Sequence, residues 1–170
     1  MTFDDTQVDG TEANLVEIWL RKDPVRWVAG AAAGLIAGLF SLLIYMVICN
    51  QVGLEYLYPV KVAAIPFLGG EALTYGWGSS VVVGLIIYLG ISTFLGVIYA
   101  HFTGTNSFKA LLGVGLTWGV FSWIFISNLY VPAFREVFVA EIPAGISFIV
   151  NLIYGVALTS VAFFDRILRG

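Results

Sequence analysis

Four long apolar segments, separated by shorter polar ones, set the pattern of this sequence. A hydrocarbon core about 30 Å thick needs about 20 apolar residues in a helix. Acidic and basic residues are nearly absent from the segments, and Lys109 stands at the very start of the third. The pattern predicts an all-α integral membrane four-helix bundle, with spans over residues 25–49, 80–100, 108–129 and 144–164.

The N-terminal region has a different pattern. Residues 1–10 are polar, and residues 14–22 place Leu15, Ile18 and Trp19 on one face of a short helix that Pro24 ends. Such a helix fits the surface of a membrane, and a frayed tail is the alternative. We therefore expect an acidic cytoplasmic tail with an interfacial helix over residues 1–24, followed by a four-span domain over residues 25–170.

The connections between the spans differ in length. The short 101–109 loop predicts that the second and third spans are neighbours, whereas residues 50–79 form a long, only partly polar loop. Its stretch VAAIPFLGG is apolar but too short to span, and it fits a re-entrant or surface-lying segment. Glu55 and Glu71 of this loop are expected to be solvated.

Two similar octapeptides occur far apart, GLIAGLFS at 34–41 and GLTWGVFS at 115–122, and they agree at five of eight positions. LIIY at 85–88 and NLIY at 151–154 then follow in the second span of each hairpin. Duplication of a two-helix unit explains this, and the halves would then be parallel repeats. Chance is the alternative, because membrane helices use few residue types.

Small residues recur every four positions on the spans. Helices in lipid associate by close packing, which small residues permit. We predict helix-packing faces at Gly30, Gly34 and Gly38 on the first span, Gly115 and Gly119 on the third, and Ser147, Asn151, Gly155 and Thr159 on the fourth.

Composition and charge support this picture. Apolar residues make up 59% of the 170 residues and charged residues only 11%, which is too apolar for a soluble domain. No basic stripe indicates nucleic acid. Positive residues favour the cytoplasmic side of a membrane. The protein is therefore predicted in the cell inner membrane with both termini in the cytoplasm. The side that holds the termini carries more positive residues: Arg21, Lys22, Arg26, Lys109, Arg166 and Arg169, against Lys61 and Arg135 on the other side.

Candidate chemistry is sparse. His101 is the only histidine, so it could ligate a haem or pigment only if another subunit completed the site, and an interfacial hydrogen bond is the simpler role. No cluster has the spacing of a metal site, and no catalytic motif is present. Asn151, predicted about two turns into the fourth span, fits either an interhelical hydrogen bond or a solute contact. We expect a protein that is not an enzyme and has no intrinsic cofactor.

The stretch from FLGVIYAHF through GVGLTWGVFSWIFISNLYVPAF to NLIYGVAL resembles a loose group of small, uncharacterised four-span prokaryotic membrane proteins. The resemblance covers residues 28–164 and implies a four-span fold without implying an activity. Members often carry a histidine where this chain has Asn151. The matching features are Gly115, Gly119, Trp118, Trp123 and Pro132.

Two functions fit these observations better than a third, an intramembrane enzyme or a haem or quinone protein, for which paired ligands and a catalytic cluster are lacking. The first is a non-catalytic accessory subunit of a larger membrane complex, of the respiratory or photosynthetic electron-transfer type, whose glycine-rich and aromatic faces pack against other subunits or copies of itself. The alternative is a small-solute transporter or channel that acts as an oligomer. The second is less favoured, because polar residues at membrane depth mark solute paths and are scarce here.

Overall fold

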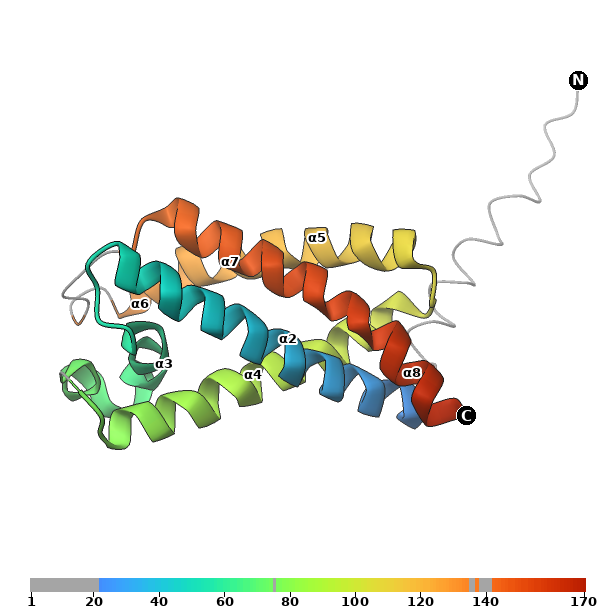
Figure 1. Cartoon of the computed structure of the whole chain (residues 1–170), viewed down its shortest axis with the longest axis horizontal. Helices are drawn as coiled ribbons and strands as arrows, with labels where there is room; N and C mark the ends of the chain where they lie inside the picture. The colour runs from blue at the N-terminus through green and yellow to red at the C-terminus, as the bar shows by residue number, and fades with distance from the viewer. Residues whose placement is uncertain (1–21, 75, 135–136, 138–141) are drawn as a thin grey trace, which may run out of the picture.

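The protein is a bundle of long helices, shown in Figure 1. The structure is a computed structural model that describes residues 22–74, 76–134, 137 and 142–170. Its described secondary structure is entirely helical, which confirms the all-α four-helix bundle; the interfacial helix predicted over residues 14–22 lies almost wholly outside the described residues. The elements are α2 (Pro24–Gln51), α3 (Tyr58–Leu68), the 3-10 helix η2 (Gly69–Leu73), α4 (Ser79–Thr103), α5 (Phe108–Phe125), the π-helical turn η3 (Ile126–Tyr130), α6 (Val131–Ala133), α7 (Ala144–Ala157), the 3-10 turn η4 (Leu158–Ser160) and α8 (Val161–Arg169).

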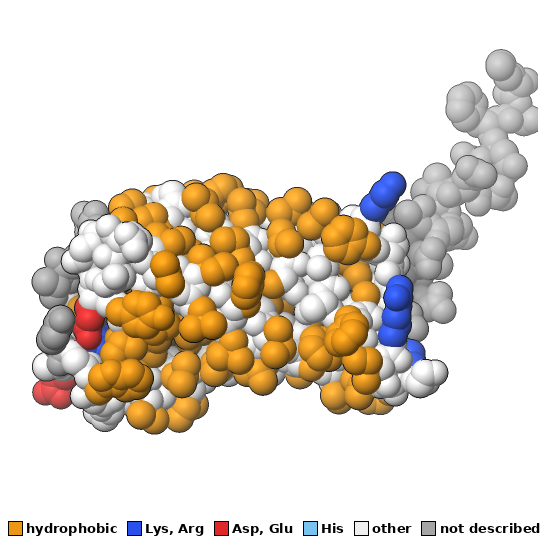
Figure 2. Space-filling view, viewed as in Figure 1, with side chains coloured by type: hydrophobic (Ala, Val, Ile, Leu, Met, Phe, Trp, Pro, Cys, Tyr) orange, Lys and Arg blue, Asp and Glu red, His pale blue; other side chains and the backbone are white. Residues whose placement is uncertain are grey.

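Four helical rods are long and apolar enough to cross a bilayer: Pro24–Gln51, Ser79–Thr103, Phe108–Ala133 and Ala144–Arg169. Even 25 residues of helix extend about 37 Å, which exceeds a hydrocarbon core of about 30 Å. Figure 2 shows apolar side chains over the middle of the face in view, with Lys and Arg at one end and Asp and Glu at the other. These features identify a multi-pass membrane protein whose surroundings are a lipid bilayer.

The helices pack in two pairs that share a central contact. α4 packs chiefly on α2, and α5 chiefly on α7, while α2 also lies against α7 and α8. The start of α2, the α4–α5 turn and the C-terminus lie together at one end of the bundle, here called the terminal end; α3 and α6 lie at the other, the loop end (Figure 1). α2 and its contact with α7 therefore join the two pairs.

The second and third spans are neighbours only beside their short turn. There the Tyr99 hydroxyl of α4 donates to the Leu111 carbonyl of α5 over 2.6 Å. From this point α4 and α5 diverge toward the loop end, as Figure 1 shows. A tight turn fixes the ends of two helices together, but the partner along the rest of each helix depends on which faces can approach closely.

Glycines line the closest helix contacts. A Cβ atom added at Gly30 would come within 2.6 Å of the Gly96 carbonyl oxygen on α4, and Gly34 lies against the same stretch of α4. In the other pair, a Cβ at Gly119 would come within 2.6 Å of the Asn151 carbonyl oxygen on α7, while Gly115 and Gly155 lie backbone to backbone. Side chains at these positions would force the helices apart.

The two pairs are alike only in part. Gly34 meets Gly96 in one pair and Gly115 meets Gly155 in the other, so the octapeptides occupy equivalent places. However, Gly96 lies eight residues after the end of LIIY, whereas Gly155 follows NLIY directly. The second-span motifs are thus offset by about two helical turns relative to the glycine contacts. Duplication of a hairpin stays a prediction.

The long loop after α2 folds back into the loop end of the bundle. α3 holds most of VAAIPFLGG, and its Lys61, Ala64 and Ile65 side chains are buried. The Val60 carbonyl of α3 lies against Gly84, in the second turn of α4. Gly69 ends α3 with φ 55°, in the left-handed region that favours glycine. The segment therefore belongs to a short helix that is buried over its first half, at the level of the second turn of α4, and exposed at Pro66 and Phe67.

Candidate functional site

A buried arginine closes the terminal end of the bundle. Arg26 of α2 is 5% exposed and donates to four oxygen atoms around the α4–α5 turn. Its Nε binds the Ala100 carbonyl at 3.2 Å, its Nη1 binds Asn106 Oδ1 at 2.5 Å, and its Nη2 binds Thr103 Oγ1 at 3.2 Å and the Thr105 carbonyl at 2.6 Å. The guanidinium thus holds the turn against α2.

The counterion of this arginine comes from the far end of the chain. Asp165 of α8 is 2% exposed, and its Oδ2 lies 3.4 Å from Arg26 Nη1. The same carboxylate accepts from Asn106 Nδ2 at 2.8 Å and Arg169 Nε at 3.0 Å. Arg169 also pairs with Asp23 at 2.5 Å. Two acids and two arginines therefore balance their charges and join three helices, as burial of charge requires.

His101 stands beside this network. Its Nδ1 accepts a hydrogen bond of 3.2 Å from Trp27 Nε1, and the two rings lie 6.0 Å apart. An imidazole that accepts at Nδ1 and is neutral carries its proton on Nε2. If Nε2 ligated a haem or pigment, the proton of a neutral imidazole would move to Nδ1. Nδ1 could then no longer accept the hydrogen bond from Trp27.

A second buried ion pair lies at the loop end. Lys61 of α3 is fully buried, and its Nζ binds both carboxylate oxygens of Glu55, at 2.7 Å and 2.6 Å. It also donates to the Thr74 carbonyl at 2.5 Å, while Glu55 accepts from the Gly76 N–H at 3.0 Å. The expectation that Glu55 is solvated is wrong, because α3 folds inward and carries its lysine to the carboxylate. Glu71 is exposed, as expected.

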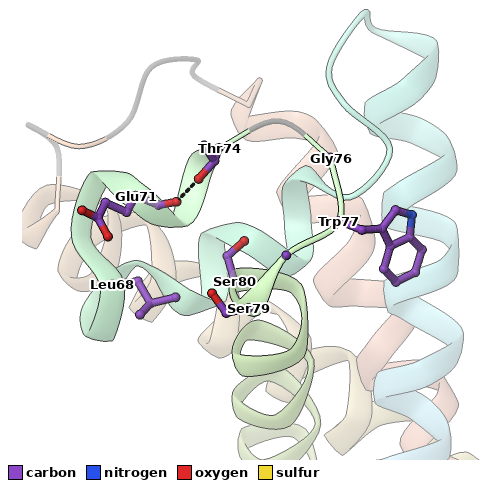
Figure 3. Close-up of a pocket in the computed structure, with 8 residues that line it drawn as sticks. Leu68, Glu71, Thr74, Gly76, Trp77, Ser79 and Ser80 are labelled. Carbon is purple, nitrogen blue, oxygen red and sulfur yellow. Dashed lines mark hydrogen bonds between the residues drawn. The ribbon is translucent and has the colours of Figure 1, made fainter.

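A pocket of about 150 Å³ opens beside this ion pair, between η2 and the first turn of α4. Figure 3 shows the Ser79 and Ser80 side chains directed from α4 into this space and the Glu71 carboxylate directed away from them. The Thr74 hydroxyl donates to the Glu71 carbonyl, which closes the turn above the pocket. Its lining residues are Leu68, Glu71, Thr74, Gly76, Trp77, Gly78, Ser79 and Ser80.

The polar residues predicted on the fourth span bond within their own helix. Asn151 Nδ2 donates to the Ser147 carbonyl over 2.8 Å, and Ser147 Oγ donates to the Ala144 carbonyl over 3.1 Å. Thr159 Oγ1 similarly donates to the Val156 carbonyl. Asn151 contacts Gly119 of α5 through its backbone, and its side-chain amide forms no hydrogen bond to another described helix.

The two tryptophans of α5 have different surroundings. Trp123 Nε1 donates to the Ala144 carbonyl at 3.2 Å and its ring packs edge-on against Phe148, so it joins α5 to α7. Trp118 packs against Tyr99 of α4 at a ring distance of 6.4 Å. Its buried Nε1 has no hydrogen-bond partner in the described residues.

Sequence reasoning missed both ion pairs. The charge pattern indicates only a flanking charge at Arg26, and Asp165 lies just beyond the predicted fourth span. A signal existed, because an arginine and an aspartate at span ends on one side of a membrane can meet. In the described part of the chain no group of three or more His, Cys, Asp or Glu residues is placed to hold a metal ion.

Comparisons with family models, with curated proteins and with solved structures found no match to this chain.

Proposed function

We propose that the chain is a non-catalytic accessory subunit of a larger membrane complex, and that the outer face of α5 packs against a helix of another subunit. The observation that carries this proposal is Gly113, an exposed glycine inside α5 with no atom near the position that its Cβ would take.

Glycine inside a helix costs about 1 kcal/mol relative to alanine, so its presence calls for a packing reason. Gly30, Gly34, Gly96 and Gly115 have that reason inside the bundle, because each lies against a neighbouring backbone. Gly113 points the other way. A helix of another subunit, packed closely against Gly113, would explain why a glycine stands there.

The surroundings of Gly113 fit such a helix. Thr117 lies one turn further along α5, is exposed, and satisfies its hydroxyl by donating to the Gly113 carbonyl over 3.0 Å. The pair places two small residues one turn apart without an unmet polar group, which is the pattern that permits close helix approach in lipid. Gly90 on α4 is also open, but Ile86 and Phe94, one turn away on either side, are 67% and 63% exposed and make that surface uneven.

The internal charges support a structural role. Arg26 is paired with Asp165 and Lys61 with Glu55, so these buried groups hold helices together.

The test compares three tagged proteins in native membranes: the wild type, G113L and G90L. After solubilisation in mild detergent, mass spectrometry identifies the proteins that copurify in stoichiometric amounts. The proposal expects one set of membrane subunits with the wild type and with G90L, and loss of that set with G113L. Thermal unfolding of each purified chain should be alike, because both substitutions point away from the bundle.

Recovery of the chain alone, as a monomer or homo-oligomer, would refute the accessory role. The small-solute transporter or channel would then be the hypothesis to test, by substitution of Asn151 with leucine in a transport assay. Copurification that G113L leaves unchanged would refute the α5 face while leaving the accessory role standing.

A further inference from the structure

The pocket at the loop end has hydrogen-bond donors for which the described residues provide no side-chain partner. Gly78, at the N-cap of α4, has no side chain, and no side-chain hydrogen bond caps this helix of 25 residues. The first backbone N–H groups of a helix have no partner within it and carry the positive end of its dipole. The start of α4 therefore presents partial positive charge to the pocket.

A buried hydroxyl provides a second, independent observation. Ser80 is only 5% exposed, lines the pocket, and its hydroxyl makes no hydrogen bond to the described residues. Figure 3 shows this hydroxyl directed from the first turn of α4 toward η2. Ser80 Oγ is not one of the fully enclosed unpaired atoms of the described residues, so it opens into the pocket and can bond a ligand oxygen there. Ser79 offers a second hydroxyl at the mouth.

The position of the pocket restricts the ligand. α4 begins its apolar span at this turn, and Val82 and Ile86, on the following two turns, are 60% and 67% exposed. Trp77, 83% exposed, lies beside the pocket, and tryptophan is enriched at the headgroup level of membranes. A phospholipid whose acyl chain lies along Val82 and Ile86 would bring its phosphate to Ser79 and Ser80.

The charges around the pocket restrict it further. Among the described residues that line the pocket there is no Lys or Arg, and the positive charge of nearby Lys61 is balanced by Glu55. Glu71 is exposed at the far side, with its carboxylate directed away from Ser79 and Ser80 (Figure 3). Because the described lining has no basic side chain to neutralise a phosphate dianion, a headgroup that carries its own ammonium next to its phosphate fits this site better than free phosphate does.

We propose that this pocket binds the headgroup of an aminophospholipid of the phosphoethanolamine type, with its phosphate at the N-terminus of α4 and Ser80 and its ammonium at Glu71. The lipid would be held in one orientation against α4 and η2.

Native mass spectrometry of the full chain in detergent tests the proposal, with phosphatidylethanolamine, phosphatidylcholine and phosphatidylglycerol as probes. The wild type should retain one phosphatidylethanolamine in preference to the other two. S80A should weaken retention about tenfold, the effect of one hydrogen bond to a charged group. S107A is the matched control, because Ser107 also begins a long helix without a side-chain cap, at the opposite end of the bundle.

Two further variants separate binding from folding. G78D places a carboxylate at the N-cap, which caps the helix and occupies its donors. It should abolish retention while the melting temperature stays level or rises. E71Q should remove the preference for phosphatidylethanolamine over phosphatidylglycerol.

Three results would overturn the proposal. The first is that S80A and G78D retain lipid as the wild type does, and the second is that S107A loses it equally. Displacement of the lipid by glycerophosphoethanolamine, which has no acyl chains, at equal concentration would instead assign the site to a soluble phosphate ester.

Discussion

The strongest test of the bundle is to neutralise Asp165 at the terminal end. The Asp165 and Arg26 side chains are 2% and 6% exposed, and their charged atoms lie 3.4 Å apart. D165N keeps the shape of the side chain and removes its charge. The buried arginine would then lose this carboxylate, while its described hydrogen bonds to the neutral oxygens of the α4–α5 turn remain.

The expected loss follows from this geometry. Removal of one partner from a buried ion pair costs about 3–5 kcal/mol, because the remaining charge is left uncompensated. Arg26 keeps its hydrogen bonds to Ala100, Asn106, Thr103 and the Thr105 carbonyl, so we expect the lower end, about 3 kcal/mol. The control R169Q, at a half-exposed arginine bound to the same carboxylate, should lose clearly less.

Reversible unfolding in mixed micelles, followed by tryptophan fluorescence, measures these losses. Trp27 lies beside the network through His101 and reports its opening. The double variant R26M/D165L replaces the pair by apolar side chains and should lose less than D165N. The reasoning is refuted if D165N is as stable as the wild type. It is also refuted if the stability lost by R26M/D165L equals the sum of the losses of R26M alone and D165L alone.

Three further predictions concern other parts of the chain. K61M should lower stability by about 3 kcal/mol because it strands the Glu55 carboxylate, and K61M/E55Q should recover part of that loss in the same unfolding assay. G155L should separate α5 from α7 and cost about 3 kcal/mol or more, since its side chain meets backbone; an unchanged melting temperature would contradict this contact. S107C in a C49A background should react with a membrane-impermeant maleimide in inverted vesicles and not in intact cells, and the reverse pattern would overturn the predicted orientation.

Local features of the sequence were enough to predict the spans. Each predicted span lies within a helix, and the helices extend only a few residues beyond it. The predicted glycines could be located by spacing alone, but not their partners. The spacing of Gly34 and Gly38 does not say whether they face α4, α5 or lipid. The burial of Lys61 could not be predicted either, because the sequence places it in a loop and only the fold brings it against Glu55.

The sequence by itself determined that this is a four-span, all-α membrane protein with small-residue faces. Each apolar segment must by itself be long enough to cross the bilayer, so a span can be predicted from its own residues without knowledge of the neighbouring helices. The tertiary structure alone decided that α2 pairs with α4 and α5 with α7, that Arg26 meets Asp165, and that Ser80 lines a pocket. These contacts join residues far apart in the chain, and close packing between whole helix faces selects them.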